Sequence, residues 1–180
     1  MYSESERLSA LLQFGLDNSK EPIFDDITRL AANICDTPIS LITIIEHDRQ
    51  WTKSRYGLSL LETSRDNSFC SHAIIHPDEL MEVTNALEDE RFKNNPLVQE
   101  DPKMRFYAGM PIVTDKGLPI GAVCVIDGEP RRLSMDQRAS LTVLAKVTMQ
   151  LIYARTVKRK LLEVDCQFDD EIHILLNNLP

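Results

Sequence analysis

The chain has 180 residues, of which 43 % are hydrophobic and 27 % charged, and its formal net charge at pH 7 is -8. This length suits one domain with short extensions, and the composition excludes disordered and fibrous classes. Because the acidic excess repels phosphate backbones and anionic lipids, we expect no nucleic-acid partner and no membrane partner. The longest apolar runs are also far shorter than the roughly 20 residues of a membrane span.

The cysteine pattern bears on metal binding and on location. Cys35, Cys70, Cys124 and Cys166 are scattered and form no C-x-x-C pair. This spacing argues against a structural zinc site, so we expect no bound metal. Reduced thiols suit a reducing compartment, and the first residues do not have the pattern of a secretory leader. We therefore expect a cytoplasmic protein.

Two helices are predicted before the first strand. Apolar residues within 5–16 follow helical spacing, and Gly15 favours the end of this helix. Pro22 suits the first turn of a second helix, whose apolar stripe extends to Ile34.

Two hairpins are predicted to supply most of a sheet. Residues 38–46 are β-branched and apolar on both faces, which predicts a central strand, and the more polar residues 50–56 are predicted to pair with it. Residues 105–113 and 118–127 flank a Lys-Gly corner that favours a tight turn. With residues 80–84 as a fifth strand, we expect one antiparallel sheet.

A long connection and a long helix complete the pattern. Residues 57–103 contain only short helical pieces, predicted at 71–75 and 86–92, and so long an irregular segment inside a domain is more often functional than idle. Ser134 and Gln137 form a capping box that predicts the start of a helix. That helix carries apolar residues on more than one face and is expected to continue past the globular body.

The ordered blocks resemble a bacterial GAF domain of signalling proteins. The matching stretches are FDDITRLAANICDTPISLITIIEHDRQWTKSRYGL, SFCSHAI, ALEDERFKNNPLV, MRFYAGMPIV and IGAVCVIDGEPRRLSMDQ. The resemblance implies an α+β, PAS-like fold: a central antiparallel sheet of five or six strands, with the terminal helices on one face and the long connection covering a pocket on the other. It divides the chain into an N-terminal helix (1–20), a GAF domain (21–155) and a C-terminal signalling helix that begins a linker or next module (156–180).

The resemblance also implies a function. We expect a non-catalytic sensory or regulatory module that either binds a small molecule or transmits a conformational state to an output domain. This output domain is expected to be covalently linked, C-terminal to Pro180. Histidine kinases and diguanylate cyclases are such outputs, and neither signature occurs in these residues. One alternative is a free methionine-(R)-sulfoxide reductase, which uses cysteines over the pocket, and another is a ligand-free dimerisation scaffold. The sequence specifies no ligand and no cofactor.

The stretch SFCSHAI offers a thiol and an imidazole, but their spacing of two residues does not bring them together on a helix. We therefore expect Cys70 to be structural. Bilin-binding GAF domains attach their pigment through a Cys followed directly by His, whereas Ser71 intervenes here. Any ligand is expected between the sheet and the connection, on the strand face that carries Tyr107. The candidate pocket residues are Trp51, Phe69, Cys70, His72, Phe92, Arg105 and Tyr107.

The terminal helices predict a homodimer. The last helix has two apolar stripes side by side, and one sheet contact buries only one of them. We expect the first and last helices of two chains to form a four-helix bundle. The predicted dimer residues are Leu8, Leu11, Leu12, Leu144, Val147, Leu151 and Ala154.

Overall fold

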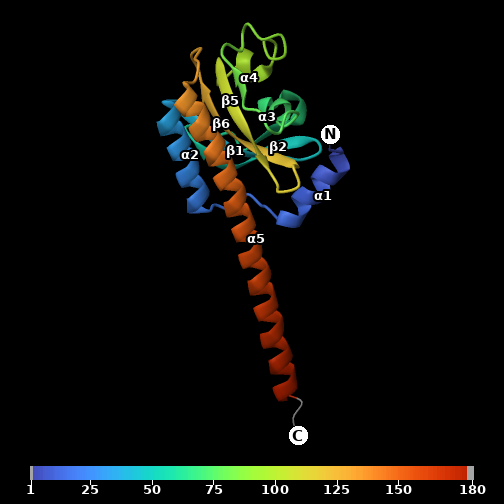
Figure 1. Ribbon diagram of the computed structural model, residues 1–180. Helices are drawn as coiled ribbons and strands as arrows, with labels where there is room; N and C mark the ends of the chain where they lie inside the picture. Colours follow the sequence, from blue (N-terminus) through green and yellow to red (C-terminus); the bar gives the residue numbers. More distant parts are fainter. Residues whose placement is uncertain (1, 178–180) are drawn as a thin grey trace.

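The computed structural model describes residues 2–177, with side chains described through Glu163. A six-stranded antiparallel sheet has the order β3-β2-β1-β6-β5-β4. Helices α2 and α5 lie on one face, and the connection with α3 and α4 lies on the other (Figure 1). The strands are β1 (Ile39–Ile45), β2 (Arg49–Tyr56), β3 (Glu62–Ser64), β4 (Met81–Val83), β5 (Phe106–Val113) and β6 (Pro119–Asp127). The helices are α1 (Glu4–Phe14), α2 (Pro22–Cys35), α3 (Phe69–Ala73), α4 (Pro96–Gln99) and α5 (Met135–Asn177), with a 3₁₀ turn at Arg65–Asn67. The predicted α+β, GAF-like fold is confirmed.

The local start and stop signals act as predicted. Gly15 adopts a φ of 52° and ends α1, while Pro22 begins α2. In the capping box at the start of α5, the backbone N–H of Gln137 donates to the Ser134 hydroxyl and the Ser134 N–H donates to the Gln137 side chain. Gly117, with a φ of 75°, forms the corner of the β5–β6 hairpin.

Within the connection the helix prediction is only half right. The predicted piece at 71–75 lies largely within α3, but residues 86–92 form turns. Side-chain oxygens of Asn85 and Asp89 accept hydrogen bonds from nearby backbone N–H groups, and such local bonds compete with helix formation. Helix α4 was not predicted; Asn95 caps it and Pro96 occupies its first turn.

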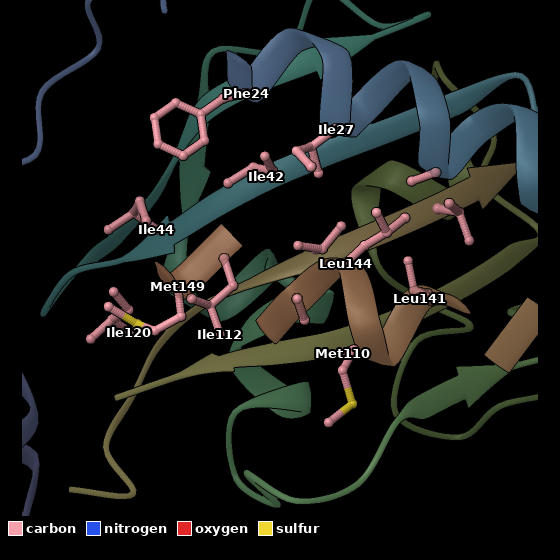
Figure 2. Packing of buried hydrophobic residues seen from close by; sticks show 14 of the residues in the cluster. Phe24, Ile27, Ile42, Ile44, Met110, Ile112, Ile120, Leu141, Leu144 and Met149 are labelled. Atoms are coloured by element: carbon pink, nitrogen blue, oxygen red, sulfur yellow. The ribbon is translucent and has the colours of Figure 1, made fainter. Parts of the chain in front are cut away.

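The central strands are buried on both faces, so the sheet separates two apolar layers. On the helix side, Ile42 and Ile44 of β1 pack among residues of α2, α5 and the neighbouring strands (Figure 2). On the connection side, Leu41 and Ile45 of the same strand pack against α3 and the turns beyond it. This alternation assigns every residue of β1 to one layer.

Two residues of the predicted dimer contact are buried in the helix layer of the chain itself. Leu11 and Leu144 belong to the chain's own core, with 6 % and 7 % of their surface exposed. Helix α2, rather than α1, lies alongside the body half of α5, whereas α1 sits at one end of the sheet (Figure 1). A bundle of α1 and α5 through these leucines would expose the core that they fill.

Helix α1 is fastened to the body by a buried arginine. The Arg7 side chain is fully buried, and its Nη1 donates to the Ile45 carbonyl at 2.7 Å. Its Nε and Nη2 donate to the Glu4 carboxylate at 2.8 and 2.7 Å, and Arg65 also donates to Glu4. The Tyr2 hydroxyl adds a bond to the Ile74 carbonyl at 2.8 Å. These contacts tie the first helix to β1 and to the connection.

Replacing Arg7 by leucine should lower the free energy of unfolding by about 1–3 kcal/mol, because the Ile45 carbonyl is left buried without this donor. Urea denaturation measures the loss. The matched control is Arg29→Leu on the exposed side of α2, where the pair with Asp26 is 3.9 Å long and solvated, so the change should stay within about 0.5 kcal/mol. Equal losses for the two variants would contradict a stabilising role of the buried guanidinium.

The Glu4 carboxylate makes part of this contact dependent on pH. Hydrogen bonds from Arg7, opposed by burial and helped by Arg65, lower the pKa of Glu4 to about 2. A lowered folded-state pKa gives stability that is complete above the unfolded pKa and is lost as pH falls toward the folded one. The difference in unfolding free energy between wild type and Glu4→Gln should therefore be largest at pH 7 and shrink between pH 4.5 and 2. A difference that is independent of pH in urea denaturation would contradict this assignment.

Candidate functional site

The candidate site is a group of side chains between the sheet and the connection. We call it the connection-face cluster; its members are Phe69, Cys70, Phe92, Tyr107 and Cys124. Phe69 and Cys70 come from α3, Phe92 from the turns after β4, and Tyr107 and Cys124 from strands β5 and β6. None of the five exposes more than 2 % of its surface.

Helix α3 begins where its capping residue is anchored. The Ser68 hydroxyl accepts a hydrogen bond from the Ser71 N–H at 2.9 Å and donates one to the Gln50 side chain on β2 at 2.5 Å. The Ser71 hydroxyl in turn donates to the Arg65 carbonyl at 3.0 Å. With the first turn held in this way, Phe69 and Cys70 point into the apolar layer.

Aromatic rings fill most of the space under the connection. The rings of Phe69 and Phe92 stack with centroids 3.9 Å apart and planes 12° from parallel, and Phe69 also meets Tyr107 at 5.2 Å. His72, which is half-buried, meets the edge of Phe92 at 4.8 Å. Leu41, Ile74 and several smaller side chains complete the layer. The predicted pocket region is therefore occupied by the protein's own side chains.

A polar group lies inside this apolar layer. The Tyr107 hydroxyl donates to the Cys70 sulfur at 3.2 Å, and the sulfurs of Cys70 and Cys124 are 3.8 Å apart. Burial raises the pKa of Tyr107 well above its ordinary value, and the contact with Cys70 together with burial does the same to the pKa of Cys124. Burial also raises the pKa of Cys70, but hydrogen bonds with Cys124, Thr43 and Tyr107 lower it. Of the two thiols, Cys70 is thus the easier to ionise.

Two predicted site residues lie elsewhere. Trp51 belongs to the helix-side core, because it pairs directly with Ile44 and directly opposed residues share a sheet face. Its Nε1 donates to the Glu46 carboxylate at 2.7 Å. The Arg105 guanidinium donates to the carbonyls of Val98 and Met104, at 2.8 and 3.0 Å, and so fastens the end of the connection. Neither residue lines the space under the connection as predicted.

Two hollows on the described surface lie away from the cluster. One is a groove bordered by α1, the β5–β6 turn and the middle of α5, and another is an apolar groove between α1 and the β1–β2 turn. Over residues 2–163, no three His, Cys, Asp or Glu side chains gather where they could hold a metal ion. No described helix is both long enough and apolar enough to cross a membrane.

Comparison with known proteins decides the family. Residues 19–152 match the GAF domain family. The chain belongs to the GAF domain family. The chain is 40 % identical over 152 residues to a cyclic di-GMP phosphodiesterase, PA2567, of Pseudomonas aeruginosa. The alignment covers 83 % of this chain and 26 % of that relative, so the chain spans about a quarter of the relative's length.

Solved GAF domains have the same fold at low sequence identity. The GAF domain of a phosphoenolpyruvate-protein phosphotransferase from Coxiella burnetii superposes with a TM-score of 0.62 at 16 % identity, covering 88 % of this chain and 99 % of that one. The PixJ GAF domain of Thermosynechococcus elongatus gives 0.62 at 11 % identity, covering 91 % and 98 %. A type II free methionine-R-sulfoxide reductase from Thermoplasma acidophilum gives 0.55 at 13 % identity, covering 73 % and 96 %. At these identities the likeness shows the fold alone.

Truncating Phe92 should create a large cavity under the connection. The free energy of unfolding of Phe92→Ala should fall by about 3–5 kcal/mol, as for other buried phenylalanines, because the ring stacks on Phe69 and is almost wholly buried. Leu87→Ala, in the same turns but 45 % exposed, serves as the control and should change it by less than about 1 kcal/mol. A loss below about 1 kcal/mol for Phe92→Ala in urea denaturation would show that this layer is loosely filled.

Proposed function

We propose that this GAF domain is a non-catalytic regulatory module that transmits a conformational state, through α5, to an output domain linked after it. The observation that carries the proposal is the division of α5. Its first half packs on the sheet through residues such as Leu141, Ala145 and Ile152, and its second half continues as one helix to Asn177, beyond the body (Figure 1). A continuous helix is stiff, so a tilt or rotation at the sheet displaces its far end.

A polar joint lies where α5 leaves the body. Arg155 of α5 donates from Nε to the Glu21 carboxylate at 2.6 Å and from Nη1 to the Gly15 carbonyl at 3.0 Å. Lys53 of β2, whose side chain is completely buried, donates to the same Glu21 oxygen at 2.6 Å. Burial raises the pKa of Glu21, but these two hydrogen bonds outweigh it and hold the pKa below its ordinary value. The ionised carboxylate thus links the sheet, the α1–α2 segment and α5.

Through Glu163, the final contacts of α5 with the body lie close to this joint, where the Arg159 guanidinium also packs against Gly15. The Thr156 hydroxyl donates to the Phe14 carbonyl at 3.3 Å. Immediately beyond it, Val157 and Leu161 are 57 % and 61 % exposed. A movement of the sheet or of α1 therefore reaches the helix at its point of exit, which supports α5 as the route of the signal.

An exposed apolar stripe on α5 supports a homodimer. The stripe faces away from the body and follows alternating spacings of four and three, with Gln150 as its polar member, which is the pattern of a coiled-coil seam. Its apolar members are Val143, Val147, Ala154, Val157 and Leu161. On the neighbouring helix α2, Ile23, Leu30 and Ile34 are also exposed. We therefore assign the dimer contact to α2 and α5, with Val147 and Ala154 retained from the predicted set.

The packed cluster supports transmission of a state over storage of a ligand. A small molecule under the connection would have to separate Phe69 from Phe92, whose rings are in stacking contact. The reductase alternative is less well supported, because Cys70 and Cys124 are buried behind these rings, and a substrate as large as methionine sulfoxide has no open approach to them. If a compound is found to bind by opening the connection, hydrogen exchange with and without that compound should show protection in residues 57–103.

The relative supports a place in cyclic di-GMP signalling. The protein from Pseudomonas aeruginosa is named a phosphodiesterase of this nucleotide, and the present chain corresponds to about a quarter of it. We propose an output domain of this signalling class beyond Pro180, controlled by the GAF domain. Cys35, Cys70 and Cys124 are free thiols, which suits the reducing cytoplasm in which such signalling takes place.

Sedimentation velocity tests the dimer on which this route depends. The wild-type chain should sediment as a dimer at micromolar concentration, and Val147→Glu combined with Leu161→Glu should sediment as a monomer, because both changes put charge into the apolar stripe. Glu163→Lys, an exposed position on the opposite side of the helix from Leu161, should remain a dimer. A monomeric wild-type chain, or a dimeric double variant, would overturn the proposed contact.

A further inference from the structure

The paired thiols of the connection-face cluster have no part in the proposed transmission through α5. Cys70 lies on α3, within the connection, and Cys124 lies on β6, one of the two central strands. They are far apart in sequence, yet their sulfurs are 3.8 Å apart. We propose that Cys70 and Cys124 are an oxidation site, which hydrogen peroxide, a far smaller molecule than an amino-acid substrate, converts into a disulfide that fastens the connection to the sheet.

The local geometry favours bond formation between these two sulfurs. A disulfide has an S–S length of about 2.05 Å, so the sulfurs must approach by less than 2 Å in total. Cys124 is held in the ladder between Leu41 and Gly109, whereas Cys70 sits on a single helical turn that can settle toward the strand. The Cys70 sulfur therefore makes most of the movement, and the strand register does not change.

The two sulfurs have different roles in this reaction because the Tyr107 hydroxyl donates to only one of them. It donates to the Cys70 sulfur at 3.2 Å, which stabilises a thiolate there. Gly109 makes room for this hydroxyl, because a Cβ at that position would lie 2.1 Å from the Tyr107 oxygen. The thiolate is the nucleophilic form of cysteine, so Cys70 is the attacking sulfur and Cys124 the resolving one.

The reaction balances with one molecule of hydrogen peroxide. The Cys70 thiolate attacks one peroxide oxygen, the O–O bond breaks, and the departing hydroxide takes a proton to become water. The Cys124 sulfur then attacks the resulting sulfenic acid, the S–O bond breaks, and the second hydroxide leaves as water with the Cys124 proton. In total the two thiols lose two electrons and two protons, and the peroxide is reduced to two molecules of water.

The other thiol described in the core provides an internal comparison. Burial alone raises the pKa of Cys35 to about 11, and Cys35 lies in the helix-side cluster, on the other side of the sheet from the pair. It has neither the thiolate-stabilising donor nor the resolving partner. Cross-linking should therefore be specific to Cys70 and Cys124.

Mass spectrometry of the peroxide-treated full chain tests the proposal. A variant with Cys35→Ser and Cys166→Ser should lose about 2 Da and give a cross-linked peptide pair containing Cys70 and Cys124. Adding Cys124→Ser should abolish the loss and leave Cys70 as the sulfenic acid or its overoxidised forms. Tyr107→Phe, which keeps the ring, should slow cross-linking by about tenfold because the thiolate loses a donor.

The same measurement on the wild-type chain tests the proposal even if a variant does not fold. In wild type the same peptide pair should appear, and the oxidised chain should melt at a higher temperature than the reduced one, because the new bond constrains the unfolded state. Overoxidation of Cys70 without a cross-link, or a folded chain whose two thiols stay reduced in excess peroxide, would overturn the proposal. Because this test does not depend on the oligomeric state, it can fail while the proposed α5 dimer stands.

Discussion

Strands β1 and β6 lie at the centre of the sheet, and their side chains are buried on both faces and mostly apolar. Burying apolar surface is the main favourable term in folding, so such a sheet needs a cover on each side. Helices α2 and α5 provide one cover with regular ridges of aliphatic side chains. The connection provides the other with little regular structure, and it relies on large rings instead. The rigidity of one face and the aromatic filling of the other both follow from this single requirement.

The two covers bear differently on function. The helix-side cover includes the first half of α5, so a movement of the sheet also moves the helix that leaves the body. The connection-side cover is held by Ser68, Arg105 and the stacked rings of Phe69 and Phe92, which leaves it packed yet built from short pieces. Loops open locally at lower free energy than core strands and helices. The connection is thus the part of the domain best suited to changing state, and α5 the part best suited to reporting it.

Much of the fold could be predicted from sequence because its signals are local. The apolar run of β1, the Lys-Gly corner and the capping box at Ser134 each act through neighbouring residues. The face of Trp51 could not be predicted in this way, since strand parity gives only relative orientation and the pairing with Ile44 fixes the absolute face. The contact of Cys70 with Cys124 joins residues far apart in the chain, and no local pattern encodes it. Around Asn85, side-chain hydrogen bonds outweighed a helical spacing of apolar residues.

The central claim is that the region under the connection is filled by the protein's own side chains and that the domain signals by changing state. Native mass spectrometry of the freshly purified full chain tests this claim most directly. The account predicts the mass of the polypeptide alone, as dimer and residual monomer. A stoichiometric small-molecule adduct that survives buffer exchange and protects residues 57–103 in hydrogen exchange would contradict it.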